Sequence, residues 1–322
     1  MKITLIITSV LSCIVVSGCG GRMGHTPDRA FVNPSSLGTH KGISEGQGML
    51  YTLRGGTIDM AHVRGTADQT KKAYDRAYNC IVDGRRSFTV SPAWERITNK
   101  VTFDYPADWG RTPEAERQKI AHAIAIKVAP VVGYNSTLMH EMLTWKGAKF
   151  FLIEPEFKSS FSWEDLYCHA VGCWVAVDAI NAGGDFNTAF TRLLNQELKR
   201  LGVVSKSKAK QITESVRGKW YTSASLYMRN MDSYLDDDIS PCIVPGYTTE
   251  PPISYPLPNL DGIEQYGIGV TYTIRSLFLE NETLKRIAGT SDDLQPLKDF
   301  KPIMQNIQAE AKQKHTELII HK

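Results

Sequence analysis

The sequence predicts an α+β domain that is mainly helical and has a few short antiparallel strands. Two observations lead to this fold class. Apolar residues recur with a helical period over long segments, whereas alternation of apolar and polar residues is confined to short ones. The predicted helices are 58–82, 112–145, 163–180, 185–201, 205–220 and 302–320, and the predicted strands are 49–53, 86–90, 101–105 and 266–275.

The first 18 residues predict a lipoprotein signal peptide. Lys2 precedes an apolar run that is too short for a stable membrane anchor. The run ends in Val16-Ser17-Gly18-Cys19, which resembles the lipobox of bacterial lipoproteins, whose cysteine becomes the acylated, palmitate-bearing N-terminus. The residue after Cys19 is glycine and not aspartate, which favours the outer membrane over the inner one. We therefore expect a lipid-anchored envelope protein that faces the periplasm.

Composition divides the rest of the chain into two parts. Residues 19–48 are rich in Gly, Ser and polar residues and predict a flexible tether, and residues 49–322 predict a single α+β domain. The formal net charge is +3, from 37 basic and 34 acidic side chains, which gives no indication of nucleic-acid binding. The expected partners are the membrane, through lipidated Cys19, and an envelope small molecule or polymer that the sequence does not identify.

Four cysteines remain once Cys13 leaves with the signal peptide and Cys19 is acylated. In an envelope compartment they can form disulfides. Cys168 and Cys173 lie within one predicted helix and are not expected to bond to each other. A bridge between Cys80 and Cys242 stays open as an alternative.

The first chemical stretch is Arg54-Gly-Gly-Thr-Ile-Asp-Met-Ala-His-Val-Arg64. A Gly-Gly turn leads into a helix on which Asp59 and His62, three residues apart, share one side. Asp59 falls within the apolar stripe of this helix, so it must cap the first turn, orient His62 or bind a metal. Arg64 falls on the opposite, solvated face and is also a candidate residue of the surrounding pocket.

The second stretch runs from Thr137 to Trp145. His140, Glu141 and Thr144 form a narrow polar band between apolar residues, which is typical of a pocket wall. His-Glu invites comparison with the zinc motif H-E-x-x-H, but Thr144 occupies the second histidine position, so the motif is broken.

The third stretch, Ser159 to Cys173, opens a helix that is apolar on all sides and is therefore expected to be central and buried. Ser162 is the predicted N-cap. Asp165 and His169 lie four residues apart on one face, and Glu164 precedes them. These acids either stabilise the helix N-terminus or serve as ligands.

Together these motifs resemble those of an uncharacterised bacterial lipoprotein family, catalogued as domain of unknown function 4056. The resemblance runs from about Met49 to beyond Gly172 and groups the three stretches. It implies no activity or cofactor.

The leading functional hypothesis is a metal-dependent hydrolase. Its candidate metal ligands are Asp59, His62, His140, Asp165 and His169, with zinc the expected ion, and Glu141 is the candidate general base on metal-bound water. Arg64, Thr144 and Glu164 are candidate pocket residues. The alternative is a non-catalytic envelope lipoprotein in which the same pairs form a polar binding pocket or a buried structural network.

Overall fold

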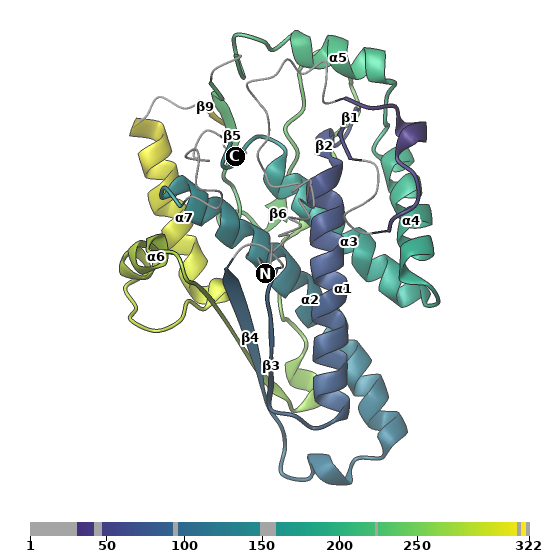
Figure 1. Ribbon diagram of the computed structural model, residues 1–322, viewed down its shortest axis with the longest axis vertical. Helices are drawn as coiled ribbons and strands as arrows, with labels where there is room; N and C mark the ends of the chain where they lie inside the picture. The colour runs from purple at the N-terminus through teal and green to yellow at the C-terminus, as the bar shows by residue number, and fades with distance from the viewer. Residues whose placement is uncertain are drawn as a thin grey trace, which may run out of the picture.

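A computed structural model describes residues 31–41, 47–92, 96–148, 159–222, 225–313 and, for the backbone alone, 317–319. Three helices form its centre: α1 (Met60–Val82), α2 (Glu114–Trp145) and α3 (Asp165–Ala182). Figure 1 shows α1 running alongside α2 and α3, with the remaining elements around them. The α+β fold predicted from the sequence is confirmed. The signal peptide and Cys19 lie outside the described residues.

Two glycines bring the central helices close together. A Cβ on Gly172 of α3 would lie 2.4 Å from the carbonyl oxygen of Val63 on α1, and a Cβ on Gly133 of α2 would lie 2.3 Å from the Thr70 hydroxyl. Real Cβ atoms do not approach other atoms so closely, so only glycine permits this spacing of the helix backbones. The close approach at Gly172 brings the N-terminal turns of α1 and α3 next to each other.

Helix α2 is continuous over 32 residues although Pro130 lies inside it. The residues that follow Pro130 are almost all buried, and this burial offsets the cost of about 3 kcal/mol of an interior proline. The predicted helix start at residue 112 is wrong, because α2 begins at Glu114. Thr112 is extended, as expected for a residue before proline, and Pro113 is the N-cap without a side-chain hydrogen bond.

The largest sheet has three antiparallel strands in the order β3 (Ser87–Val90), β4 (Ile97–Asp104), β8 (Gly269–Ser276). Its register places Val101 of β4 between Phe88 of β3 and Tyr272 of β8, all three on the buried face. Alternate residues point to the other face, which gives the apolar and polar alternation read from the sequence. The predicted strands 86–90, 101–105 and 266–275 correspond to these three.

Three small pairs complete the strands. β1 (Met49–Thr52) and β2 (Gly56–Asp59) form a hairpin, β5 (Met228–Asn230) lies parallel to β9 (Glu317–Ile319), and β6 (Asp238–Ile239) pairs with β7 (Tyr255–Pro256). The hairpin explains why the predicted helix 58–82 begins later than expected. Residues 58 and 59 end β2, so α1 begins at Met60 and not at Ile58.

The outer helices are α4 (Phe186–Arg200), α5 (Lys206–Glu214), α6 (Glu280–Ala288) and α7 (Pro296–Gln313). The predicted helix 185–201 corresponds to α4. Its N-cap is Asp185, whose carboxylate accepts a hydrogen bond from the Thr188 amide at 2.9 Å. Helix α5 ends at Glu214 and not at Trp220, because Trp220 turns away to pack against Trp163 with ring centroids 5.6 Å apart. Helix α7 begins six residues before Pro302.

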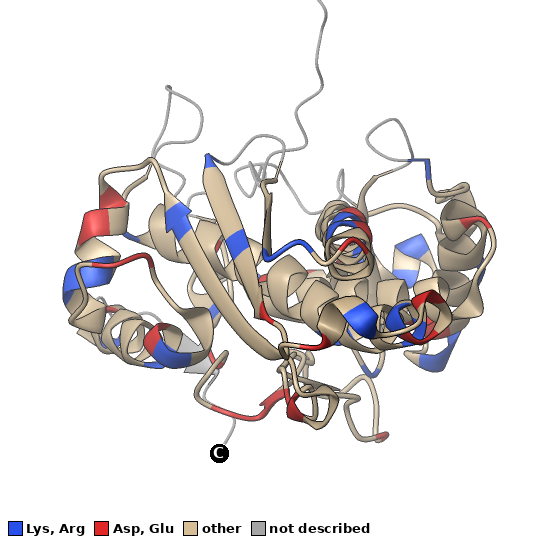
Figure 2. Cartoon of the chain, turned by 90° about the horizontal axis from the view of Figure 1, so that it is seen from below, with Lys and Arg blue, Asp and Glu red and all other residues tan. Residues whose placement is uncertain are grey.

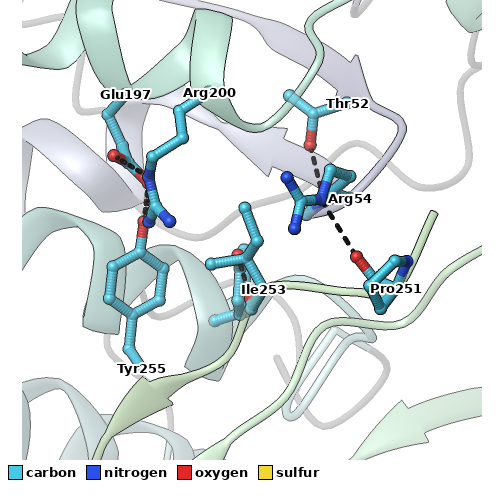
Figure 3. Close-up of polar contacts among 9 residues, drawn as sticks. Thr52, Arg54, Glu197, Arg200, Pro251, Ile253 and Tyr255 are labelled. Carbon is cyan, nitrogen blue, oxygen red and sulfur yellow. Dashed lines mark hydrogen bonds and ion pairs between the residues drawn. The ribbon is translucent and has the colours of Figure 1, made fainter.

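The proline-rich segment 241–258 crosses the surface with little regular structure. Arg54 Nε donates to the Pro251 carbonyl at 3.0 Å, and the Tyr255 hydroxyl donates to Glu197. Figure 3 shows Arg200 beside Glu197 and Tyr255, and Arg54 reaching Pro251. These contacts fix the segment against the hairpin and α4.

Within the described residues, no helix is both long enough and apolar enough to cross a bilayer. Positively and negatively charged residues are interspersed along the outer elements, as the colours in Figure 2 show.

Candidate functional site: a buried acid and imidazole cluster

The hairpin turn positions the start of α1. Gly56 has φ +67, and a Cβ there would lie 2.3 Å from the Cys242 carbonyl oxygen, so both the conformation and the space require glycine. Strand β2 then ends at Asp59, whose carboxylate accepts the Ala61 amide at 2.7 Å and caps α1. Of the roles considered for Asp59, this contact is that of a helix cap.

The structure pairs His62 with a different acid from the one that its own helix suggested. His62 Nδ1 lies 3.1 Å from Asp165 Oδ1, and both side chains are nearly buried. His169 does not take Asp165 as its partner in the described contacts. Its Nδ1 lies 2.9 Å from the Thr66 hydroxyl, and its ring packs against that of His62 with centroids 5.0 Å apart. His62, Asp165 and His169 therefore meet between α1 and α3.

The predicted N-cap of α3 is also wrong. Residues 159–164 form a turn in which Phe161 has a left-handed backbone with φ +56, and Glu164 precedes the first helical residue. The Phe161 amide donates to Glu141 Oε2 at 2.8 Å, and the Ser162 amide donates to Asp165 Oδ2 at 2.7 Å. A left-handed non-glycine residue costs of order 1 kcal/mol and persists only where its surroundings fix it. The carboxylates of Glu141 and Asp165 supply that fixation.

Glu164 is a buried carboxyl group beside a second one. Burial raises its pKa to about 8, and the negative charge of Asp165 contributes to the rise. Its carboxyl group therefore keeps its proton at neutral pH. Within the described part of the chain, Glu164 Oε2 is buried without a hydrogen-bond partner. Since buried polar atoms are almost always bonded, this one indicates a place for a water molecule, an ion or a ligand.

The two other histidines are neutral at physiological pH. Burial lowers the pKa of His140 to about 4, with a further decrease from the charge of His62 and an opposing increase from Asp165. Burial also lowers the pKa of His169, and the charges of His62 and His140 act in the same direction. His140 is therefore within electrostatic range of the His62 and Asp165 pair. In the described residues, His169 Nε2 is a second buried atom without a partner.

Arg229 on β5 is a site residue that the sequence analysis missed. Its guanidinium is buried, donates through Nη1 to the Ser160 carbonyl, and lies over the Trp145 ring at 5.4 Å. Burial lowers its pKa to about 10, while Asp165 and Glu141 oppose the decrease. The signal was weak in the sequence, because β5 has only three residues and Arg229 lies 64 residues after the start of α3.

Two candidate pocket residues, Arg64 and Thr144, donate hydrogen bonds to backbone carbonyl groups. Arg64 is buried, contrary to the solvated face predicted for it, and its Nη2 donates to the Leu37 carbonyl at 2.9 Å. It thereby holds residues 31–41 against α1. The Thr144 hydroxyl donates to the His140 carbonyl of its own helix at 2.8 Å.

No group of three or more His, Cys, Asp or Glu side chains in the described ranges is arranged to hold a metal ion. The four cysteines Cys80, Cys168, Cys173 and Cys242 are free and buried, so the bridge between Cys80 and Cys242 considered above does not form. Burial raises the pKa of the Cys168 thiol well above its usual value. It is thus a poor nucleophile even beside His62.

Comparison with known proteins identifies the family. A family model described as a protein of unknown function (DUF4056) matches residues 23–229. The chain belongs to the DUF4056 family. The matched region contains all the helices and turns of the site and ends at Arg229. Searches of curated proteins and of solved structures gave no match.

Proposed function

We propose that this DUF4056 protein is a lipid-anchored envelope hydrolase that works by general acid and base catalysis at the cluster around His62 and Asp165. The observation that carries the proposal is the pair of buried polar atoms without partners, Glu164 Oε2 and His169 Nε2, within one cluster of titratable groups. A purely structural network would be expected to satisfy its own hydrogen bonds.

The proposed base is His62. The Asp165 carboxylate orients the imidazole through Nδ1, which leaves Nε2 to take a proton from an attacking water molecule. The His62 side chain is 10% exposed, more than that of Asp165 at 4%, so water and substrate would approach from its side. Water then adds to the substrate as the bond to the leaving group breaks.

The proposed acid is Glu164. Its raised pKa keeps a proton available at neutral pH, and this proton passes to the leaving group. Two neighbouring carboxyl groups with different protonation states are a common arrangement for such chemistry. Glu141, the base expected from the sequence, holds the Phe161 amide, which favours a positioning role.

A divalent metal, with zinc the leading candidate, stays a proposal with its own test. Neutral His140 and His169 and the Asp165 carboxylate are suitable donor types. The geometry of the described residues does not group three such donors around one point, so no step above is routed through a metal. Metal analysis of the purified protein, with His62→Ala and His140→Ala as comparisons, tests it. Stoichiometric zinc that both variants lose would support the metal-dependent form.

A specific observation also favours a second candidate, a non-catalytic envelope lipoprotein. Glu141 and Asp165 each accept a backbone amide of the turn before α3, as structural residues do. In this case the cluster would shape a polar binding pocket or simply a buried network.

One experiment separates the two functions. The purified protein is incubated with chromogenic carboxyl esters, phosphoesters, glycosides and peptides. We expect hydrolysis of one class and a loss of at least about 100-fold in kcat for His62→Asn and Glu164→Gln. Thr222→Ser, a conservative change at a half-buried residue outside the cluster, is the control. If none of the substrates is hydrolysed, or if His62→Asn retains full activity with an intact fold, the non-catalytic candidate takes precedence.

The proposed location has a separate test. Replacement of Cys19 by alanine should move the protein from the membrane fraction to the soluble periplasmic fraction, because the acyl chains supply the anchor. Unchanged membrane association would contradict lipidation at Cys19.

A further inference from the structure

The loop that joins β8 to α6 presents two leucines to solvent. Leu277 is 74% exposed and Leu279 is 86% exposed, far more than Leu297 at 45% and Tyr227 at 37%, the other exposed large hydrophobic residues in the described part of the chain. The loop lies beside α6 (Figure 1). Single exposed apolar residues are common, but two so fully exposed leucines at positions i and i+2 form an apolar tip that folding leaves uncovered.

Hydrogen bonds fix the loop on both sides. The Leu277 amide donates to the Arg96 carbonyl at 3.1 Å, and the Phe278 amide donates to the Ser276 hydroxyl at 3.2 Å. The Ser276 amide donates to the Asn281 side chain at 3.1 Å, and the Asn281 backbone amide donates to the Phe278 carbonyl at 3.1 Å. The two leucines are therefore held outward by a defined turn, and little conformational entropy remains to be lost when they bind.

Basic side chains accompany the apolar tip. Three exposed basic residues lie near the loop: Arg96 directly before β4, Lys100 on β4 and Arg275 on β8. In the described part of the chain, none of them forms an ion pair. Figure 2 shows Lys and Arg positions among these strands. Arg96 has a left-handed backbone with φ +48, and its guanidinium lies 5.7 Å from the centre of the Phe278 ring. This conformation fixes a cation at the base of the loop.

The acidic groups nearest in sequence to the loop lie on α6. Glu282 is paired with Lys285 at 3.3 Å, and Glu280 opens the helix. Asp292 and Asp293 also lie close to the base of the loop, because Leu294 next to them pairs with Ile274 of β8. Among the described residues, basic side chains without an ion pair therefore accompany the leucines on the strands, while acidic side chains lie on α6 and beside Leu294.

We propose that this loop docks onto an anionic lipid bilayer, with Leu277 and Leu279 entering the boundary between headgroups and acyl chains and Arg96 and Arg275 contacting lipid phosphates. Apolar side chains next to basic ones are the combination that interfacial membrane binding uses. The proposal takes its setting from the envelope location proposed above, where a single lipid anchor would tether the domain without orienting it. The loop would supply the second contact and fix which face meets the membrane.

The test uses the chain from residue 19 onward with Cys19→Ala, so that no acyl chain contributes. Its co-sedimentation is measured with vesicles of equal parts phosphatidylglycerol and phosphatidylcholine, and with vesicles of phosphatidylcholine alone. We expect the chain to bind the anionic vesicles and to bind the neutral ones more weakly. Binding to the anionic vesicles should weaken when salt is added. The affinity of the double variant Leu277→Ser/Leu279→Ser for the anionic vesicles should be lower than that of the parent by a factor of about ten or more. Leu297→Ser, a change at an exposed leucine elsewhere, should bind as the parent does.

The basic contribution is tested separately. Arg96→Gln/Arg275→Gln should reduce binding to anionic vesicles and remove most of its salt dependence, without changing binding to neutral vesicles. Failure of the parent chain to bind anionic vesicles, or an equal loss in Leu297→Ser, would overturn the proposal. These outcomes do not depend on hydrolase activity or on acylation of Cys19 in cells, so the proposals fail independently.

Discussion

At the scale of single residues, the cluster consists of side chains whose ordinary ionisation is changed by burial. Glu164 keeps its proton near neutral pH, whereas His140 and His169 lose theirs well below it. Such opposite shifts arise at catalytic sites and in structural networks alike. The unbonded atoms of Glu164 and His169 are what favour a site here, because neither local chain geometry nor a described neighbour satisfies them.

The raised pKa of Glu164 predicts the pH dependence of stability. The folded protein binds a proton here up to about pH 8, whereas the unfolded chain releases it near pH 4.5. Over this window the folded state binds more protons, so the stability from this group is present below pH 4.5 and lost as pH rises. Glu164→Gln should remove that loss. Thermal unfolding midpoints of wild type and variant at pH 5 and pH 8 check this, and parallel pH profiles would contradict it.

Asp59 offers a test that separates a helix cap from a metal ligand. Asp59→Ala should lower the free energy of unfolding by about 1 kcal/mol, because the Ala61 amide loses its acceptor. Asp59→Asn retains a capping oxygen and should cost little. Urea unfolding of the two variants measures the difference. If both variants lose stability equally, the charge of Asp59 matters more than its cap.

At the scale of elements, the site depends on how closely α1 approaches α3. Strand β2 sets where α1 begins, the turn 159–164 sets where α3 begins, and Gly172 allows the two backbones to meet. His62 and Asp165 pair across this contact although 103 residues separate them in the chain, as Thr66 pairs with His169.

Glycine substitutions test this contact. Gly172→Ala should destabilise the fold by about 1 to 3 kcal/mol, because its Cβ would clash with the Val63 backbone, which cannot rotate away. Gly65→Ala is the matched control, since it lies in α1 with no atom within 4 Å of the new Cβ. That change should be neutral or stabilise by up to about 1 kcal/mol. Equal effects in denaturant unfolding would argue against close packing of α1 and α3.

At the scale of the whole molecule, one apolar interior joins the central helices, the three-stranded sheet and α7. A second, smaller cluster gathers around Trp163, Trp220 and Val244 near the β1 and β2 hairpin. All four described cysteines are buried in these interiors or next to them, and none is bonded to another.

Burial predicts how these thiols react. In native protein that has not been reduced, Cys80, Cys168, Cys173 and Cys242 should resist alkylation, because they are buried and their thiols have raised pKa values. After denaturation without reductant, all four should become labelled. Peptide mapping by mass spectrometry measures the labelling, and a disulfide-linked peptide between any two of them would contradict the structure.

The sequence by itself determined the local features of this protein. Apolar periodicity predicted the central helices and the three-stranded sheet, and a helix cap was one of the roles open to Asp59, because such features depend on residues a few positions apart. Only the tertiary structure decided the partners. Helical spacing paired Asp59 with His62 and Asp165 with His169, whereas the fold pairs His62 with Asp165 and His169 with Thr66. For the same reason, the sequence did not indicate that Arg229 lies beside this cluster or that Arg64 bonds to the Leu37 carbonyl. A side chain's spacing within a helix fixes its direction, but its partner depends on which other helix packs there, and close packing at Gly172 made that choice.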